Sequence, residues 1–148
     1  MINGKLVMCK AFYNMSSELE GAIKESVTDC ADDLLRVATE RAPVKSKTLE
    51  QSGTKTPVKK SGNTLVSQVS FRARKKSFNY AVKMDRTTYK LGDKSIQKSK
   101  RGVRSVFTNQ TMKVGKGYLS DTAKQCHDGY TKHVQDKVEE EIKKLGFK

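Results

Sequence analysis

The chain has 148 residues, with 30 lysines and arginines against 16 aspartates and glutamates, which gives a formal net charge of +14. This length fits one domain, residues 1–148, and an apolar content of 35% supports only a modest core. The longest apolar run, Leu6-Val7-Met8-Cys9, is far shorter than the roughly 20 residues of a membrane span, so we expect no transmembrane helix and no signal peptide.

Residues 16–42 carry the pattern of an amphipathic helix. Apolar residues recur at steps of three and four from Leu19 onward and include Leu34 near the middle of the helix. The segment that starts at Ser17 fits a capping box, and Pro43 ends the helix because a proline disfavours the helical conformation of the residue before it.

Residues 54–84 change to the period of a β-sheet. The runs 54–59 and 64–72 flank Ser61-Gly62-Asn63, a turn signal, and therefore predict a hairpin. Alternate residues of the second run, Leu65, Ser67, Val69 and Phe71, would lie on one side of the sheet. Pro57 confines the first strand to an edge or a bulge. Aromatic and β-branched residues between Phe78 and Met84 predict a third strand.

Residues 85–117 have no sustained period and are rich in glycine and lysine. We interpret them as a mobile basic arm that becomes ordered on assembly, with a short hairpin around residues 103–107. The alternative is a solvated insertion without a role. Residues 118–145 then predict a second helix, which would contact the first near Val134 and end at Gly146.

These elements predict an α+β domain. It would hold a small antiparallel sheet of about three to four strands, with two long helices packed on one face and a long basic loop.

The sequence carries no phosphate-binding loop, dinucleotide fingerprint or metalloprotease motif. Three cysteines, odd in number and without metal-ligand spacing, argue against a disulfide framework or a zinc site. Cys126, Tyr130 and His133 share one face of the second helix, but such residues are more often packed in a core. We therefore expect no enzyme, no metal and no cofactor.

Charge is unevenly distributed along the chain. Residues 16–42 hold seven acidic and three basic groups, whereas residues 86–116 hold nine basic groups against Asp93 alone. We interpret Asp29, Asp32 and Asp33 as a solvated acidic face that could meet the basic strands of a neighbouring copy. This asymmetry predicts either a polyanionic partner or complementary patches between copies of the chain, and the sequence leaves both open.

The best candidates for contact with a polyanion are basic residues of the middle of the chain: Arg72, Arg74, Lys75, Lys76, Lys98, Lys100, Arg101 and Arg104. Phe78, Tyr80 and Tyr89 lie among them and could stack on bases. No recognised nucleic-acid module is present, so these residues support binding to a nucleic-acid backbone without sequence specificity.

Four short motifs occur in a characteristic order: Ala42-Pro43-Val44, Thr48-Leu49-x-x-Ser52, Phe78-Asn79-Tyr80-Ala81-Val82 and Tyr118-Leu119. The chain resembles the tail-completion (neck or minor capsid) proteins of long-tailed double-stranded DNA bacteriophages. The resemblance covers residues 16–145 and marks Pro43, Val44, Leu49, Ser52 and Tyr80 as its turn motif. Lys47 stands where the family has a glycine, and Met84-Asp85 with the basic arm replaces a shorter acidic segment.

The resemblance implies a non-enzymatic structural protein of the virion that joins head to tail. It would form a homo-oligomeric ring, commonly of six copies, and would contact tail-terminator or tail-tube proteins and head-closure or connector proteins. Contact with viral DNA would not be sequence-specific, and no membrane is involved. The alternative function is that of a monomeric, sequence-tolerant nucleic-acid-binding protein, and a small enzyme without a recognisable active site comes third.

Overall fold

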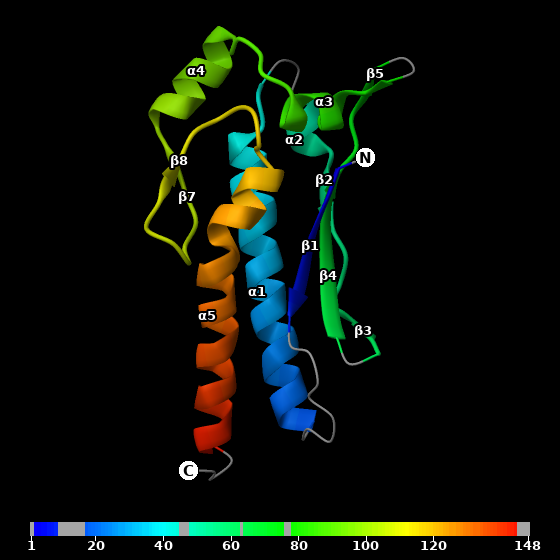
Figure 1. The fold of residues 1–148 in the computed structure, drawn as a ribbon, viewed down its shortest axis with the longest axis vertical. Coiled ribbons are helices and arrows are strands. Elements are labelled where there is room, and N and C mark those ends of the chain that lie inside the picture. The colour runs from blue at the N-terminus through cyan, green and yellow to red at the C-terminus, as the bar shows by residue number, and fades with distance from the viewer. Residues whose placement is uncertain (1, 9–16, 45–47, 63, 76–77, 145–148) are drawn as a thin grey trace.

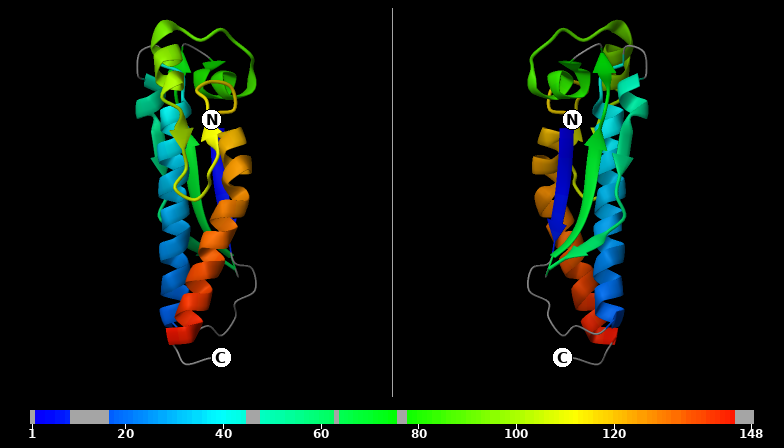
Figure 2. Two further views of the ribbon diagram at one scale, coloured as in Figure 1. Left: turned by 90° about the vertical axis from the view of Figure 1, so that its left-hand side faces the viewer. Right: turned by 90° about the vertical axis from the view of Figure 1, so that its right-hand side faces the viewer.

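The structure is a computed structural model that describes residues 2–8, 17–44, 48–62, 64–75 and 78–144. It consists of two layers, a small antiparallel sheet and a pair of long helices that lie side by side on one face of that sheet (Figures 1 and 2). Short helices and loops gather at the end of the molecule drawn uppermost in Figure 1. The predicted α+β class is confirmed.

The two long helices are α1 (Ser17–Arg41) and α5 (Ser120–Lys144), each of 25 residues. Both are amphipathic, and they pack against each other as well as against the sheet. Leu34 of α1 and Val134 of α5 are both buried in the common core, as the sequence predicts. The predicted cap at Ser17 depends on a side chain outside the described part of the chain, and Gly146 lies outside the described residues.

The strand β4 (Thr64–Phe71) forms the middle of the sheet. Strand β1 (Ile2–Met8), which the sequence analysis missed, pairs antiparallel along one edge of β4. Strands β2 (Gly53–Lys55) and β3 (Lys59–Ser61) follow each other along the opposite edge. The predicted hairpin is therefore confirmed, and Pro57 lies in the interruption between β2 and β3.

The predicted alternation along β4 is also confirmed. Leu65, Ser67, Val69 and Phe71 are buried against the helices, whereas the residues between them are half-buried on the other side of the sheet. Phe71 is the largest of these side chains, and its ring meets that of Tyr118 edge-on at 5.2 Å between centroids.

The prediction of a third strand over residues 78–84 is wrong. Only β6 (Phe78–Asn79) is extended, paired with β5 (Arg74–Lys75), and the chain then enters helix α3 (Tyr80–Arg86). The physical reason is local, because the Asn79 side-chain oxygen accepts a hydrogen bond from the Val82 N–H at 3.2 Å and so caps the helix.

The prediction that residues 85–117 form a basic arm whose one regular element is a short hairpin is wrong as well. They form helix α4 (Asp93–Lys100) and a small hairpin of β7 (Val103–Arg104) and β8 (Thr111–Met112), close to the short hairpin that was expected. Val103 and Met112 are buried in the main core. Burial of these two side chains contributes to holding the segment in place in spite of its charge.

A glycine permits the close contact between this segment and α5. A Cβ atom at Gly129 would lie 2.3 Å from the carbonyl oxygen of Phe107, a backbone atom that cannot move alone. Gly21 in α1 is exposed and has nothing within 4 Å of the corresponding position.

We expect Gly129→Ala to lower the free energy of unfolding by about 1–3 kcal/mol, because the methyl group overpacks the contact with Phe107. Gly21→Ala should instead raise it by about 0.5–1 kcal/mol through helix propensity alone. Urea denaturation of both variants measures the difference, and a stabilised Gly129→Ala protein would contradict the described packing of residues 105–108.

Candidate functional site

Most of the basic candidate residues lie on the surface at the upper end of the molecule in Figure 1. Arg72 and Arg74 are exposed beside β5, and Lys100 and Arg101 are exposed at the end of α4. Arg104 is exposed further along, where its Nε donates a hydrogen bond to Thr111 Oγ1 at 3.0 Å.

Two other candidates are not described at the level of side chains. Lys75 lies in β5 but its side chain is outside the described part, and Lys76 lies outside the described residues altogether.

Lys98, which the sequence analysis selected as a polyanion contact, is half-buried, and its amine is bound within the chain. Its Nζ donates hydrogen bonds to the carbonyl oxygens of Thr39 and Ala42, each at 3.0 Å, and also pairs with the carboxylate of Glu50. These carbonyls end helix α1, where a positive charge is favoured by the helix dipole. Lys98 therefore fixes helix α4 to the end of α1.

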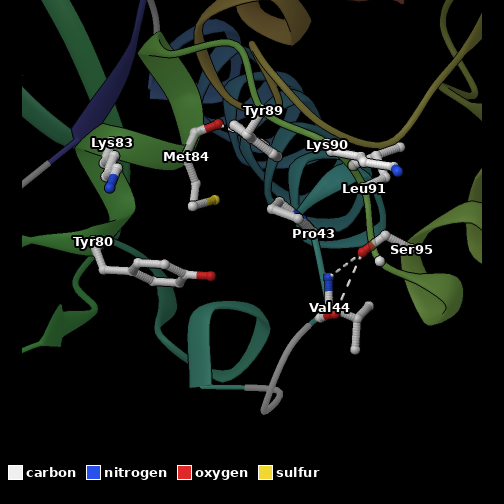
Figure 3. A pocket seen from close by; sticks show the side chains of 10 residues that line it. Pro43, Val44, Tyr80, Lys83, Met84, Tyr89, Lys90, Leu91 and Ser95 are labelled. Atoms are coloured by element: carbon white, nitrogen blue, oxygen red, sulfur yellow. Dashed lines mark hydrogen bonds between the residues drawn. The ribbon is translucent and has the colours of Figure 1, made fainter.

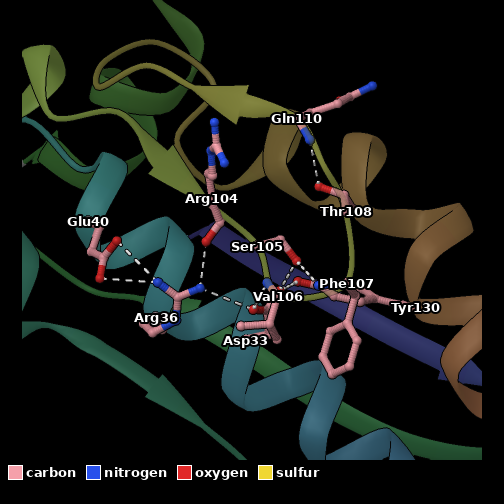
Figure 4. Close-up of polar contacts among 10 residues, drawn as sticks. All are labelled: Asp33, Arg36, Glu40, Arg104, Ser105, Val106, Phe107, Thr108, Gln110 and Tyr130. Carbon is pink, nitrogen blue, oxygen red and sulfur yellow. Dashed lines mark hydrogen bonds and ion pairs between the residues drawn. The ribbon is translucent and has the colours of Figure 1, made fainter.

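Asp33 lies at the centre of a buried polar cluster (Figure 4). It is only 4% exposed. One carboxylate oxygen accepts hydrogen bonds from Ser105 Oγ at 2.5 Å and from the Tyr130 hydroxyl at 2.6 Å. The other accepts from the Val106 N–H at 3.1 Å and from Arg36 Nη2 at 3.2 Å. The prediction of a solvated Asp33 is wrong.

The other two aspartates of the predicted acidic face also have partners within the chain. His133 Nε2 lies 3.0 Å from Asp29 Oδ2, and the His133 ring is stacked on Phe107 at 4.4 Å between centroids. Asp32 forms an ion pair with Lys55. These contacts tie α1 to α5 and to β2.

Two buried charged residues were missed by the sequence analysis. Asp85 Oδ1 accepts from the N–H groups of Leu119 at 3.0 Å and Ser120 at 3.1 Å, where α5 begins. Arg41 donates to Thr122 Oγ1 at 2.6 Å and to the Lys113 carbonyl at 2.8 Å, and burial lowers its pKa. Neither residue has a local sequence signal, since their partners lie far along the chain.

A pocket of about 450 Å³ opens at the same end of the molecule (Figure 3). Pro43, Val44 and Tyr80 of the resemblance's turn motif line it, together with residues of the segment 83–95. The Val44 N–H donates to Ser95 Oγ at 2.8 Å, which joins this turn to α4.

The other two residues of the turn motif support helix α2 (Thr48–Gln51). Leu49 is buried in the core, and Ser52 Oγ donates to the Leu49 carbonyl at 2.7 Å.

The aromatic residues proposed to stack on bases are not presented for that purpose. Tyr80 and Tyr89 are half-buried, and the Tyr89 hydroxyl donates to the Met84 carbonyl at 2.8 Å. The Phe78 side chain lies outside the described part.

The thiols of the core are held in their unreactive form. Burial raises the pKa of Cys30 to about 12 and also raises the pKa of Cys126, so both remain protonated at neutral pH. Among the described residues no cluster of histidine, cysteine, aspartate or glutamate has the arrangement of a metal site.

In the same part of the chain no helix combines the length and the apolar character that a membrane crossing requires. The chain matches no protein-family model, no curated protein and no solved structure.

We expect Asp33→Asn to lower the free energy of unfolding by about 2–4 kcal/mol, because an amide nitrogen would face hydrogen-bond donors and Arg36 would lose its buried counter-charge. The matched control is Asp32→Asn, which removes an exposed ion pair and should cost less than about 1 kcal/mol. Chemical denaturation compares the two variants. Equal losses would show that the Asp33 cluster does not stabilise the fold.

We expect the buried Tyr130 hydroxyl to make the folded protein less stable at alkaline pH. Burial raises the pKa of Tyr130, and its hydrogen bond to Asp33 raises it further. The unfolded chain releases this proton near pH 10 whereas the folded chain keeps it, so stability falls as the pH rises above that value.

In Tyr130→Phe the slope of unfolding free energy against pH, measured above about pH 10, should be smaller than in the wild type by up to about 1.4 kcal/mol per pH unit. Urea titrations across this range test it. Parallel slopes for the two proteins would refute the expected proton linkage at Tyr130.

Proposed function

We propose that this protein is a structural component of a tailed bacteriophage virion, a tail-completion or neck protein that forms a ring between head and tail. It acts by assembly and not by catalysis. The observation that carries the proposal is the meeting of the four sequence motifs at one end of the fold, although together they span residues 42–119 of the chain.

The first motif meets the third across the pocket at the end of α1. Pro43 and Val44 line the pocket opposite Tyr80, which belongs to the third motif. Leu49 anchors α2 in the core below them.

The fourth motif joins the same region from α5. The Tyr118 hydroxyl donates to the Ala81 carbonyl at 3.1 Å, and the Leu119 N–H donates to Asp85, five residues after Tyr80. Function is carried by a site and not by a fold as a whole. We take the region where the motifs meet as that site, by analogy with the family that the chain resembles, whose members assemble into rings.

A ring requires a heterologous contact, in which two different surfaces of neighbouring copies meet. Glu18, Glu25 and Asp32 are exposed and seven residues apart, so they form one acidic stripe along α1. The N-terminal end of α1, the half of the helix that carries Glu18 and Glu25, lies at the opposite end of the molecule from β5 and α4 (Figure 1). We therefore expect the stripe of one copy to contact the exposed basic residues at the upper end of an adjacent copy.

The test is the oligomeric state of the purified protein. Mass photometry and negative-stain electron microscopy should show closed rings with a mass of about six times the 16.6 kDa protomer. Because the contact is electrostatic, the rings should dissociate as the salt concentration rises.

Charge reversal identifies the surface that forms the contact. Glu18→Lys with Glu25→Lys should abolish the rings, whereas Asp136→Lys with Glu139→Lys on α5, an equal change in net charge, should leave them intact. A protein that remains monomeric at every concentration, or rings that lose stability equally in both variants, would overturn the proposal.

A further inference from the structure

The surface at the upper end of Figure 1 has a large excess of positive charge. Residues 72–116 contain 14 lysines and arginines and only two acidic residues. We define the basic end as β5 with residues 72 and 73 before it, α3, α4 with Arg101 after it, and the connections 87–92 and 113–117, which lie together at this end of the molecule (Figures 1 and 2). The two acidic residues in this segment are Asp85, which is buried, and Asp93 in the first turn of α4.

Most cations of the basic end have no counter-charge within the described part of the chain. Lys98 is used to close α1, but nine others are exposed and form no ion pair with a described residue: Arg72, Arg74, Arg86, Lys90, Lys94, Lys100, Arg101, Lys113 and Lys116. The opposite end differs, since Lys60 pairs there with Glu20 and Lys144 with Glu140.

Self-assembly cannot neutralise this charge. Each copy of the chain adds +14 to an oligomer, so the acidic stripe of a neighbour offsets only part of its basic end. The remaining positive charge is balanced by salt ions in the free protein, and a polyanion other than this chain can bind by displacing the associated anions.

The surface is unlike one that binds a folded acidic protein. Such interfaces are centred on large apolar or aromatic anchors, and Ile96, at 39% exposure, is the one exposed large hydrophobic residue that the structure describes in the basic end. Single-stranded nucleic acid would require exposed aromatic rings, whereas Tyr80 and Tyr89 are half-buried. Dispersed cations without stacking residues suit the regularly spaced phosphates of a duplex.

We propose that the basic end binds the phosphate backbone of double-stranded DNA without sequence preference. Lys94, Lys100 and Arg101 form the part of this surface contributed by α4, and the cations of β5 and the two connections extend it. The inference concerns a surface of the single chain and does not depend on ring formation, although DNA passing a ring would meet this end.

The test is fluorescence anisotropy with two labelled duplexes of unrelated sequence, measured at several salt concentrations. Both duplexes should bind with equal affinity, and the logarithm of the association constant should fall by about 0.9 per neutralised phosphate for each unit of log salt. The same measurements on single-stranded DNA and on polyglutamate give the comparison polyanions, and both should bind more weakly than the duplexes.

The triple variant Lys94→Gln, Lys100→Gln, Arg101→Gln should weaken duplex binding about tenfold or more and lower the salt slope by roughly 2–3. The control Lys24→Gln, Lys132→Gln, Lys143→Gln removes equal charge at exposed sites on α1 and α5 and should change affinity less than about threefold. Circular dichroism confirms that both variants fold.

Equal losses in the two variants would show that net charge alone attracts the duplex, and would overturn the assignment of a site. Tighter binding of polyglutamate or of the single strand would overturn the choice of duplex DNA. If the basic end does not bind the duplex but the pure protein still forms rings, this inference fails and the proposed function stands. The two experiments therefore test the two proposals separately.

Discussion

The fold depends on a carboxylate that is removed from water and surrounded by donors. Asp33 accepts hydrogen bonds from α5 through Tyr130, from the segment after β7 through Ser105 and Val106, and from Arg36 of its own helix. A buried charge is tolerated only when it is paired and fully hydrogen-bonded. Asp33 meets this condition only while α1, α5 and the loop that follows β7 are held together.

The same kind of interaction closes the other end of the helix pair. Lys98 and Arg41 bind the carbonyl groups or side chains around the end of α1, and Asp85 binds the first N–H groups of α5. Within the described residues every buried side-chain nitrogen and oxygen has a hydrogen-bond partner. With only 35% apolar residues, the chain relies on these satisfied polar contacts to define how its segments are placed.

Elements placed by apolar burial could be predicted from the sequence, and segments placed by polar contacts could not. The helices α1 and α5 and the strand β4 bury one continuous face each, so the periods of their apolar residues predict them and their common core. Residues 85–117 bury few apolar side chains and are placed by polar contacts with distant partners. Ser105 and Tyr130 lie 72 and 97 residues from Asp33, and no local pattern indicates such pairs.

The prediction of a third strand is wrong for a different reason. Residues 78–84 have the aromatic and β-branched composition of a strand, but β propensity depends strongly on context. A single cap at Asn79 and the burial of Ala81 favour the helix instead. Context also decided where the candidate charged residues lie. Lys98 and Asp33 form contacts that hold the fold together. The side chains of Arg72, Arg74, Lys100 and Arg101 are exposed, as the sequence predicts.

The charges that build the fold differ from those that face outward, and we propose that the outward charges serve assembly and DNA binding at a head–tail joint. Immunogold electron microscopy of phage particles from the strain that encodes the chain tests this assignment most directly. We expect gold at the junction of head and tail on intact virions, with none along the tail tube or on the capsid shell. Gold elsewhere on the particle, or virions that carry none of the protein, would contradict it.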